Sequence, residues 1–149
     1  MPHESPFRPR KAYEAVTLLA STTVTADANH DAVRVPYPAN GIVFVLDVTD
    51  KQTDVSDLAD VFVQTLIDGT NWVDIVHFTQ LVGNGTDAAR HVAKICCAVA
   101  QAEFEVGTAL GAAAVRHLFG DAYRVRSDIT DGGGGGATSF TYGVTAIPV

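Results

Sequence analysis

The feature that most constrains the fold of this sequence is a pair of strand-like segments joined by Asp68-Gly69. The segments on either side of this dipeptide, residues 60–67 and 72–79, are rich in β-branched and aromatic residues, which favour strands. Asp-Gly tolerates the positive φ angles of a tight turn, so the pattern predicts an antiparallel hairpin. The sequence therefore indicates a β-protein.

Strand-length segments recur along the chain and are separated by turn residues. Their spacing is typical of an all-β fold with a single β-sandwich of about eight strands, for which we expect jelly-roll-like connectivity. The expected strands are residues 15–26, 33–35, 41–49, 59–67, 72–81, 88–98, 122–130 and 139–147. The residues expected in the core are Phe44, Leu46, Phe62, Ile75, Val125 and Phe140.

Two segments interrupt this strand pattern. Residues 98–120 form an Ala-rich insert or crossover, whose apolar residues are compatible with a short helix although its glycines weaken a long one. Five consecutive glycines, residues 132–136, predict a flexible hairpin loop. The chain has 149 residues, enough for one substantial core but not for two ordinary domains. We therefore expect one sandwich domain, residues 15–149, preceded by an extended arm, residues 1–14.

The charge and cysteine content narrow the classes of partner. With 17 acidic and 10 basic residues the formal net charge is -7, which opposes attraction to nucleic-acid phosphates. No apolar stretch reaches bilayer length, and the first residues lack the apolar segment of a secretion signal, so we expect no membrane partner. The adjacent Cys96 and Cys97 would point to opposite faces of a strand, which predicts packing residues rather than a disulfide or metal site.

The first residues of the chain combine basic side chains with prolines. Such a segment is either a solvated tail or an arm that binds a neighbouring subunit. In the second interpretation its basic residues contact acidic groups of the neighbour, and Phe7 buries apolar surface there. The predicted partner-binding residues are therefore Phe7, Arg8, Arg10 and Lys11.

No group of residues has the spacing of a catalytic, cofactor or metal site, so we expect no enzyme activity and no cofactor. His77 and His91 are expected on neighbouring strands, but two ligands alone make a poor metal site. The sequence lacks a G-x-S-x-G nucleophile elbow, and its glycine run lacks the Lys-Ser/Thr of a phosphate-binding loop. Asp74 is expected to face outward. The residues Asp47, Asp50, Asp54, Asp57 and Asp60 do not match the calcium-loop pattern and indicate a solvated turn.

Trp72 is the only tryptophan of the chain and follows the predicted turn. It is expected either to anchor the hairpin, or to form a stacking platform for a sugar, as exposed aromatic residues of β-sandwiches do. The two interpretations differ in whether its indole is exposed in a groove.

Several of these segments together resemble small structural proteins of tailed bacteriophages. The matching segments are LDVT at residues 46–49, VFVQT at 61–65, DGTNWVDIVHFTQ at 68–80, YRVR at 123–126 and SFTYGV at 139–144. The corresponding segments of that family are LDVT, VxIQTSxDGxxWxD, FTQ, LRVxW and SFTFSV. The resemblance covers most of residues 41–144, and the sequence departs from it in residues 98–120 and in the pentaglycine.

The resemblance implies a capsid decoration, or cement, protein that is made in the host cytoplasm and stabilises the phage head on the capsid surface of the virion. The implied partners are the major capsid protein and the chain itself, as a homotrimer. Part of the 98–120 insert is expected at the trimer contact, because the insert is more apolar than one core needs. The hairpin at residues 65–72 also looks like that of discoidin-type carbohydrate-binding sandwiches. The alternatives are therefore a carbohydrate- or receptor-binding module and another head–tail or tail component.

Overall fold

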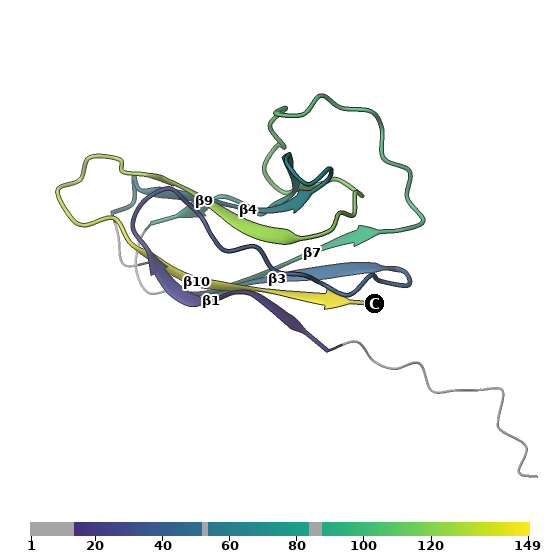
Figure 1. Ribbon diagram of the computed structural model, residues 1–149. Coiled ribbons are helices and arrows are strands. Elements are labelled where there is room, and N and C mark those ends of the chain that lie inside the picture. Colours follow the sequence, from purple (N-terminus) through teal and green to yellow (C-terminus); the bar gives the residue numbers. More distant parts are fainter. Residues whose placement is uncertain (1–13, 52–53, 84–87) are drawn as a thin grey trace, which may run out of the picture.

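The computed structural model describes residues 14–51, 54–83 and 88–149 (Figure 1). Within these ranges the chain forms ten strands and no helix, and the strand pairs are antiparallel. The strands lie in two sheets that face each other across one core. The prediction of an all-β sandwich is therefore confirmed.

The first sheet has four strands in the order β1-β10-β3-β7. They are β1 (Val16–Val24), β3 (Gly41–Asp50), β7 (Ala89–Cys96) and β10 (Phe140–Pro148). The last strand of the chain therefore lies between the first and the third. These four strands match the segments that the sequence predicts, with ends shifted by no more than two residues.

The second sheet has the order β2-β9-β4-β5-β8, and β6 pairs with the start of β4. Its strands are β2 (Ala28–Asn29), β4 (Leu58–Leu66), β5 (Trp72–His77), β6 (Leu81–Val82), β8 (Ala114–Val115) and β9 (Tyr123–Thr130). The chain therefore crosses repeatedly from one sheet to the other. Jelly-roll connectivity remains a prediction, with which this repeated crossing agrees.

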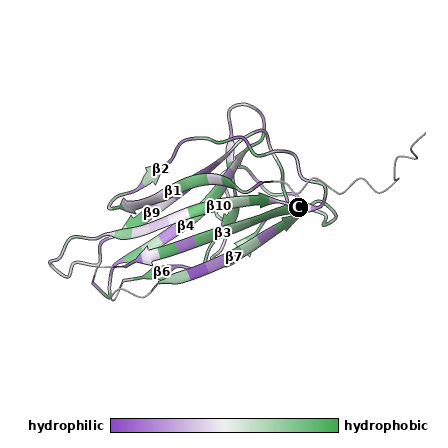
Figure 2. Cartoon of the chain, turned by 90° about the horizontal axis from the view of Figure 1, so that it is seen from below, coloured by the Kyte–Doolittle hydropathy of each residue, from purple (hydrophilic) through white to green (hydrophobic). Residues whose placement is uncertain are grey.

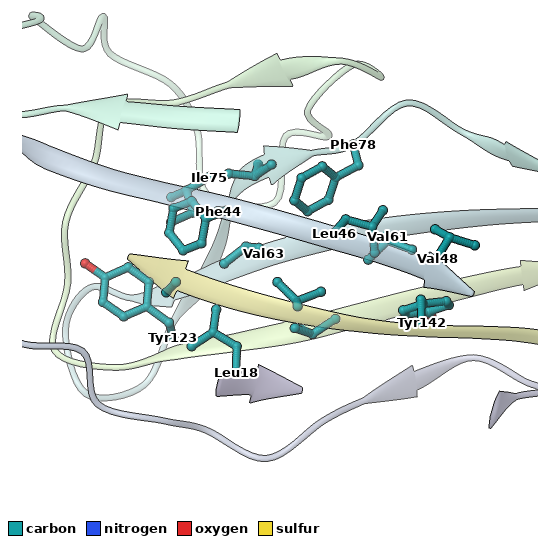
Figure 3. Packing of buried hydrophobic residues seen from close by; sticks show 14 of the residues in the cluster. Leu18, Phe44, Leu46, Val48, Val61, Val63, Ile75, Phe78, Tyr123 and Tyr142 are labelled. Atoms are coloured by element: carbon teal, nitrogen blue, oxygen red, sulfur yellow. The ribbon is translucent and has the colours of Figure 1, made fainter. Parts of the chain in front are cut away.

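A regular alternation of buried and outward-facing side chains explains why the two sheets pack together. In β3, Ile42, Phe44, Leu46 and Val48 are fully buried, and the residues between them lie on the outer face. Residues of the second sheet pack against them (Figure 3); they include Val61, Val63, Ile75, Tyr123 and Val125. Burying an aliphatic or aromatic side chain of this size contributes about 1.5–3 kcal/mol. The alternation therefore supplies much of the driving force for folding.

The predicted core residues are all buried, but one of them lies outside this core. Phe44, Leu46, Ile75, Val125 and Phe140 belong to the hydrophobic cluster. Phe62 is buried as well, yet it lies on the outer face of β4, while Val61 and Val63 take the inward positions. Phe62 is therefore buried as predicted, but Arg126 and His77 cover it on the outer side of its sheet.

The predicted hairpin is present as the β4–β5 pair. Gly69 has a φ of 79°, in the left-handed region that favours glycine. The Asp68 carboxylate accepts hydrogen bonds from the backbone N–H groups of Asn71 and Thr70, at 2.6 and 3.0 Å. These hydrogen bonds, the one from Asn71 foremost, lower the pKa of Asp68. The dipeptide therefore closes the hairpin through the carboxylate of Asp68 and the left-handed backbone of Gly69.

Two predicted strands differ from those observed. The segment at residues 33–35 is not a strand, because the chain pairs earlier, as β2, and then forms a single bridge from Val33 to Tyr123. The segment at residues 72–81 divides into β5 and β6, since the chain bends after His77 and pairs again with the start of β4. Both departures follow from pairing partners that lie far away in the sequence.

The two segments outside the strand pattern also differ from expectation. Residues 98–120 contain β8 and otherwise irregular backbone, without a helix. The pentaglycine joins β9 to β10, which belong to different sheets. It is therefore a connection between the sheets and not the expected hairpin loop.

A buried carboxylate ties this connection to the loop before β4. Asp57 is 1% exposed, and its carboxylate accepts hydrogen bonds from the N–H of Gly132 at 2.8 Å, the hydroxyl of Thr138 at 3.2 Å and the N–H of Asp54 at 3.2 Å. Buried polar groups need hydrogen-bond partners, and the carboxylate of Asp57 and the hydroxyl of Thr138 supply them to each other. The expectation of a solvated acidic turn was therefore wrong for Asp57.

A chain of hydrogen bonds links the two sheets across the core. The hydroxyl of Tyr142 on β10 donates to the hydroxyl of Ser127 on β9, which also contacts Nε2 of His30 at 3.0 Å. Tyr142 and Ser127 are fully buried, and burial raises the pKa of Tyr142 to about 12. Burial also lowers the pKa of His30. The link therefore satisfies polar groups inside an otherwise apolar layer.

We predict that Asp57→Ala destabilises the fold by about 3 kcal/mol, because three hydrogen-bond donors, one of them buried, lose a carboxyl acceptor. Urea unfolding followed by circular dichroism measures this change. Asp121→Ala removes an exposed carboxylate and is the matched control, with an expected change below about 0.5 kcal/mol. Equal stability of the two variants would show that Asp57 does not hold the connection in place.

We predict that the protein loses stability as the pH rises from 10 towards 12. The folded state holds the Tyr142 proton more tightly than the unfolded chain, so this contribution is complete below pH 10 and is lost as the pH approaches 12. A rise of the pKa from 10.0 to about 12 corresponds to about 2.7 kcal/mol. Thermal unfolding across this pH range should show a smaller loss for Tyr142→Phe, and an unchanged loss would contradict the prediction.

Candidate functional site

The outer face of the first sheet carries a continuous row of apolar side chains. Val43 lies opposite Ile147 on β10, and Val45 lies opposite Val92 on β7. Val92 is 65% exposed, and the other three are partly exposed. Figure 2 looks onto this sheet and shows hydrophobic residues along β3 and β10. We call Val43, Val45, Val92 and Ile147 the aliphatic strip.

The aliphatic strip has a visible origin in the sequence. Residues 41–49 are nearly all apolar, whereas a strand with one solvated face alternates apolar and polar residues. Alternate members of this run fill the core, and two of the residues between them, Val43 and Val45, belong to the strip. The continuous run was the signal for a second apolar face, although sequence reasoning did not assign it to a surface.

Charged residues lie beside the strip. Lys94 on β7 is opposite Val43, and Arg90 pairs with Asp47 at 3.1 Å. At the other edge of the same sheet lies β1, which directly follows the basic arm, residues 1–14. The predicted partner-binding residues of that arm lie outside the described residues; they are Phe7, Arg8, Arg10 and Lys11.

The outer face of the second sheet is polar. The guanidinium of Arg126 lies 3.9 Å from the ring centre of Phe62, and the imidazole of His77 stacks on the same ring with 4.0 Å between centroids. Arg126 also pairs with Asp128 at 3.0 Å and lies 3.7 Å from the carboxylate of Asp74. Its Nε is buried and has no hydrogen-bond partner among the described residues.

Gln64 connects this group to the hairpin. Its Nε2 donates to Asp74 at 2.9 Å, and its Oε1 accepts from Nε of Arg124 at 2.8 Å. The guanidinium of Arg124 lies 4.4 Å from the ring centre of Trp72, and burial followed by repulsion from Arg126 lowers the pKa of Arg124. Asp74 faces outward as expected, but it is only 7% exposed because these side chains cover it.

Residues 98–120 are fastened to this face by a buried arginine. Nη1 of Arg116 donates to the backbone carbonyl of Asp74 at 3.1 Å, and Nη2 donates to that of Thr108 at 2.9 Å. The same guanidinium lies 4.2 Å from the ring centre of Phe104. An Ala-rich segment without a helix is therefore held in place by side chain to backbone hydrogen bonds.

A histidine fastens the same segment at a second point. Nδ1 of His77 lies 2.7 Å from the carbonyl oxygen of Leu110, and Nε2 lies 2.9 Å from the carboxylate of Asp60. His91 lines the same small hollow as His77. Across the described ranges no group of three or more His, Cys, Asp and Glu side chains could hold a metal ion.

The structure bears on the two interpretations of Trp72 and tests the expectation for the two cysteines. Trp72 is half-buried, and Arg124 covers part of its indole. Cys96 is partly buried at the end of β7, whereas Cys97 is exposed, and both are free thiols. The expectation that both cysteines pack in the interior was therefore wrong for Cys97, because the strand ends one residue before it.

A small hollow lies between the second sheet and the 98–120 insert. Its volume is about 100 Å³. Residues of β4, β5 and β9 form one side, and residues of the insert form the other; the lining comprises Gln64, Trp72, Val73, Asp74, Gly107, Thr108, Arg116 and Arg126. Trp72 thus lies at the edge of a small polar hollow rather than on a flat exposed platform.

No protein-family model, curated protein or solved structure matches the chain. In the part of the chain that the structure describes, no helix is long and apolar enough to cross a membrane. The candidate functional surfaces are the two outer faces of the sandwich. The first face has the aliphatic strip, and the second has the arginine side chains.

Proposed function

We propose that this chain is a virion structural protein, a capsid decoration protein that binds the outside of a phage head through the aliphatic strip. In this role it is made in the host cytoplasm and lies on the capsid surface. Its partners are the major capsid protein and further copies of the same chain. The proposal combines the resemblance of residues 41–144 to tailed-phage structural proteins with the surface that the fold exposes.

The observation that carries the proposal is the aliphatic strip. The solvated face of an antiparallel sheet normally presents polar residues, but here Val43 and Val45 of β3 and Ile147 of β10 place aliphatic side chains on it. Contiguous apolar surface outside the core is typical of a contact with another protein. A rigid sandwich that presents such a face suits a protein that reinforces a shell by binding across it.

The charges around the strip specify the chemistry of the partner surface. Lys94 stands at the β7 side of the strip, and the sequence places further basic residues in the arm that precedes β1. Cations at the border of an apolar contact favour a partner with acidic groups at the matching positions. The expected binding surface of the major capsid protein is therefore apolar at its centre and acidic at its border.

The 98–120 insert supports the proposed self-association. Val99 and Val106 are 46% and 49% exposed, whereas Leu110 and Arg116 of the same insert contact the second sheet. Homo-oligomers usually close by symmetry, and the family resemblance implies a trimer. We assign the trimer contact to the insert and the shell contact to the aliphatic strip.

The carbohydrate-binding alternative receives less support from the geometry. A sugar ring stacks on a free aromatic face, but Arg124 lies over the ring of Trp72. The head–tail or tail component uses the same sandwich and the same strip. It differs from the proposed role only in which part of the virion the strip contacts.

We predict that Val92→Lys weakens binding to phage heads at least tenfold, because it places a charge in the centre of the apolar contact. Cosedimentation of the purified protein with heads that lack it, from the phage that encodes the chain, measures this. Val82→Lys is the matched control, since Val82 is 48% exposed on β6, outside the strip.

Deleting residues 1–11 should also weaken this binding and leave the sandwich folded.

Equal binding of the Val92 and Val82 variants would overturn the docking role of the strip. Binding to tails and not to heads would favour the tail component instead.

We predict that the purified protein forms trimers, three times the chain mass of 15.7 kDa, and that Val106→Lys converts them to monomers. Light scattering measures both masses, and circular dichroism verifies that the variant remains folded. The matched control is Val55→Lys, because Val55 is 64% exposed but lies outside the insert. A monomeric wild-type protein, in solution and on heads alike, would contradict the predicted trimer.

A further inference from the structure

Arginine side chains gather on the outer face of the second sheet, although the chain as a whole is acidic. Arg124 and Arg126 belong to β9, and Arg116 directly follows β8. Two carboxylates lie among them, those of Asp74 and Asp128. These five side chains carry one more positive than negative charge. The next carboxylate, Asp60 on β4, is engaged by His77 and Gln80.

Arg116 is the least compensated of these cations. It is 7% exposed, and both of its hydrogen bonds go to backbone carbonyls rather than to a carboxylate. A buried charge without an opposite charge is unfavourable, because it has lost its hydration. An anion next to this guanidinium would therefore be bound favourably.

Arg116 and Arg126 both line the hollow between the sheet and the insert. Asp74 lines it too, but its Oδ1 accepts from Gln64 and faces Nη1 of Arg126, so its charge is already compensated. The side chains of Gln64 and Thr108 add uncharged polar groups to the wall. Arg126 also pairs with Asp128, so Arg116 is the cation of this lining that has no carboxylate partner among the described residues.

The size of the hollow restricts the class of ligand. Its volume is about 100 Å³, which favours a small group such as a carboxylate with one or two attached carbons. Guanidinium groups also match the planar geometry of a carboxylate.

We propose that this hollow binds a carboxylate group through Arg116 and Arg126. The carboxylate belongs either to a small free organic acid or to an acidic side chain of a partner protein. The inference is independent of the proposed capsid role, because it rests on the charge and size of the hollow and not on the aliphatic strip.

The test uses the whole chain labelled with ¹⁵N and titrated with sodium acetate at constant ionic strength. The expected result is a saturable shift of the amide signals of Gly107 and Thr108, with no such shift in sodium chloride. Shifts that do not saturate, or that chloride reproduces, would overturn the proposal.

A variant that fills the hollow tests the location. Thr108→Leu keeps the backbone carbonyl that binds Arg116 but occupies the space, so the affinity for acetate should fall at least tenfold. Thr49→Leu is the matched control, because Thr49 is exposed on β3 in the other sheet. Circular dichroism verifies that both variants are folded. Equal acetate affinity of the two variants would overturn the location.

A second ligand distinguishes the two sources of the carboxylate. N-acetyl-glutamate N-methylamide mimics an acidic side chain of a partner protein. Tighter binding of this compound than of acetate would assign the hollow to a partner's side chain. Binding of acetate with exclusion of the larger compound would assign it to a small free acid, and either result supports a carboxylate site.

Discussion

Burial of one face of β3 and β10 against the second sheet is the interaction on which the rest of the structure depends. Both strands are central in their sheet, and their inward residues are buried along the whole length. Because β10 ends the chain and lies between β1 and β3, the sheet is complete only when distant segments have met. The loops, the insert and both outer faces take their positions from this pair.

The same alternation gives the two outer faces opposite chemistry. On the first sheet the outward positions of β3 and β10 include Val43, Val45 and Ile147, which form an apolar strip beside polar residues. On the second sheet the outward positions of β4, β5 and β9 hold arginine, glutamine, aspartate and aromatic residues. The polar ones need hydrogen-bond partners where other residues cover them. The 98–120 insert supplies some of these partners: the carbonyl of Leu110 contacts His77, and Arg116 donates to the backbone carbonyl of Asp74.

The candidate surfaces could be predicted from the sequence only in part. The apolar run at residues 41–49 marks a strand without a polar face, but which side meets solvent depends on the packing of the other sheet. Nothing local distinguishes Phe62 from a core residue, since its outer cover comes from Arg126 and His77. Asp57 likewise has the sequence context of a solvated turn, and Gly132, distant in the chain, makes it a buried acceptor.

The sequence by itself determined the all-β class, most strand positions and the hairpin at Asp68-Gly69. These follow from alternation between near neighbours and from the backbone preferences of single residues, which are local properties. Only the tertiary structure decided the strand order, the splitting of the segment at 72–81, the irregular path of the 98–120 insert and the assembly of the arginine side chains. These depend on contacts between residues far apart in the chain, such as that of Arg116 with Asp74, and no local pattern encodes them.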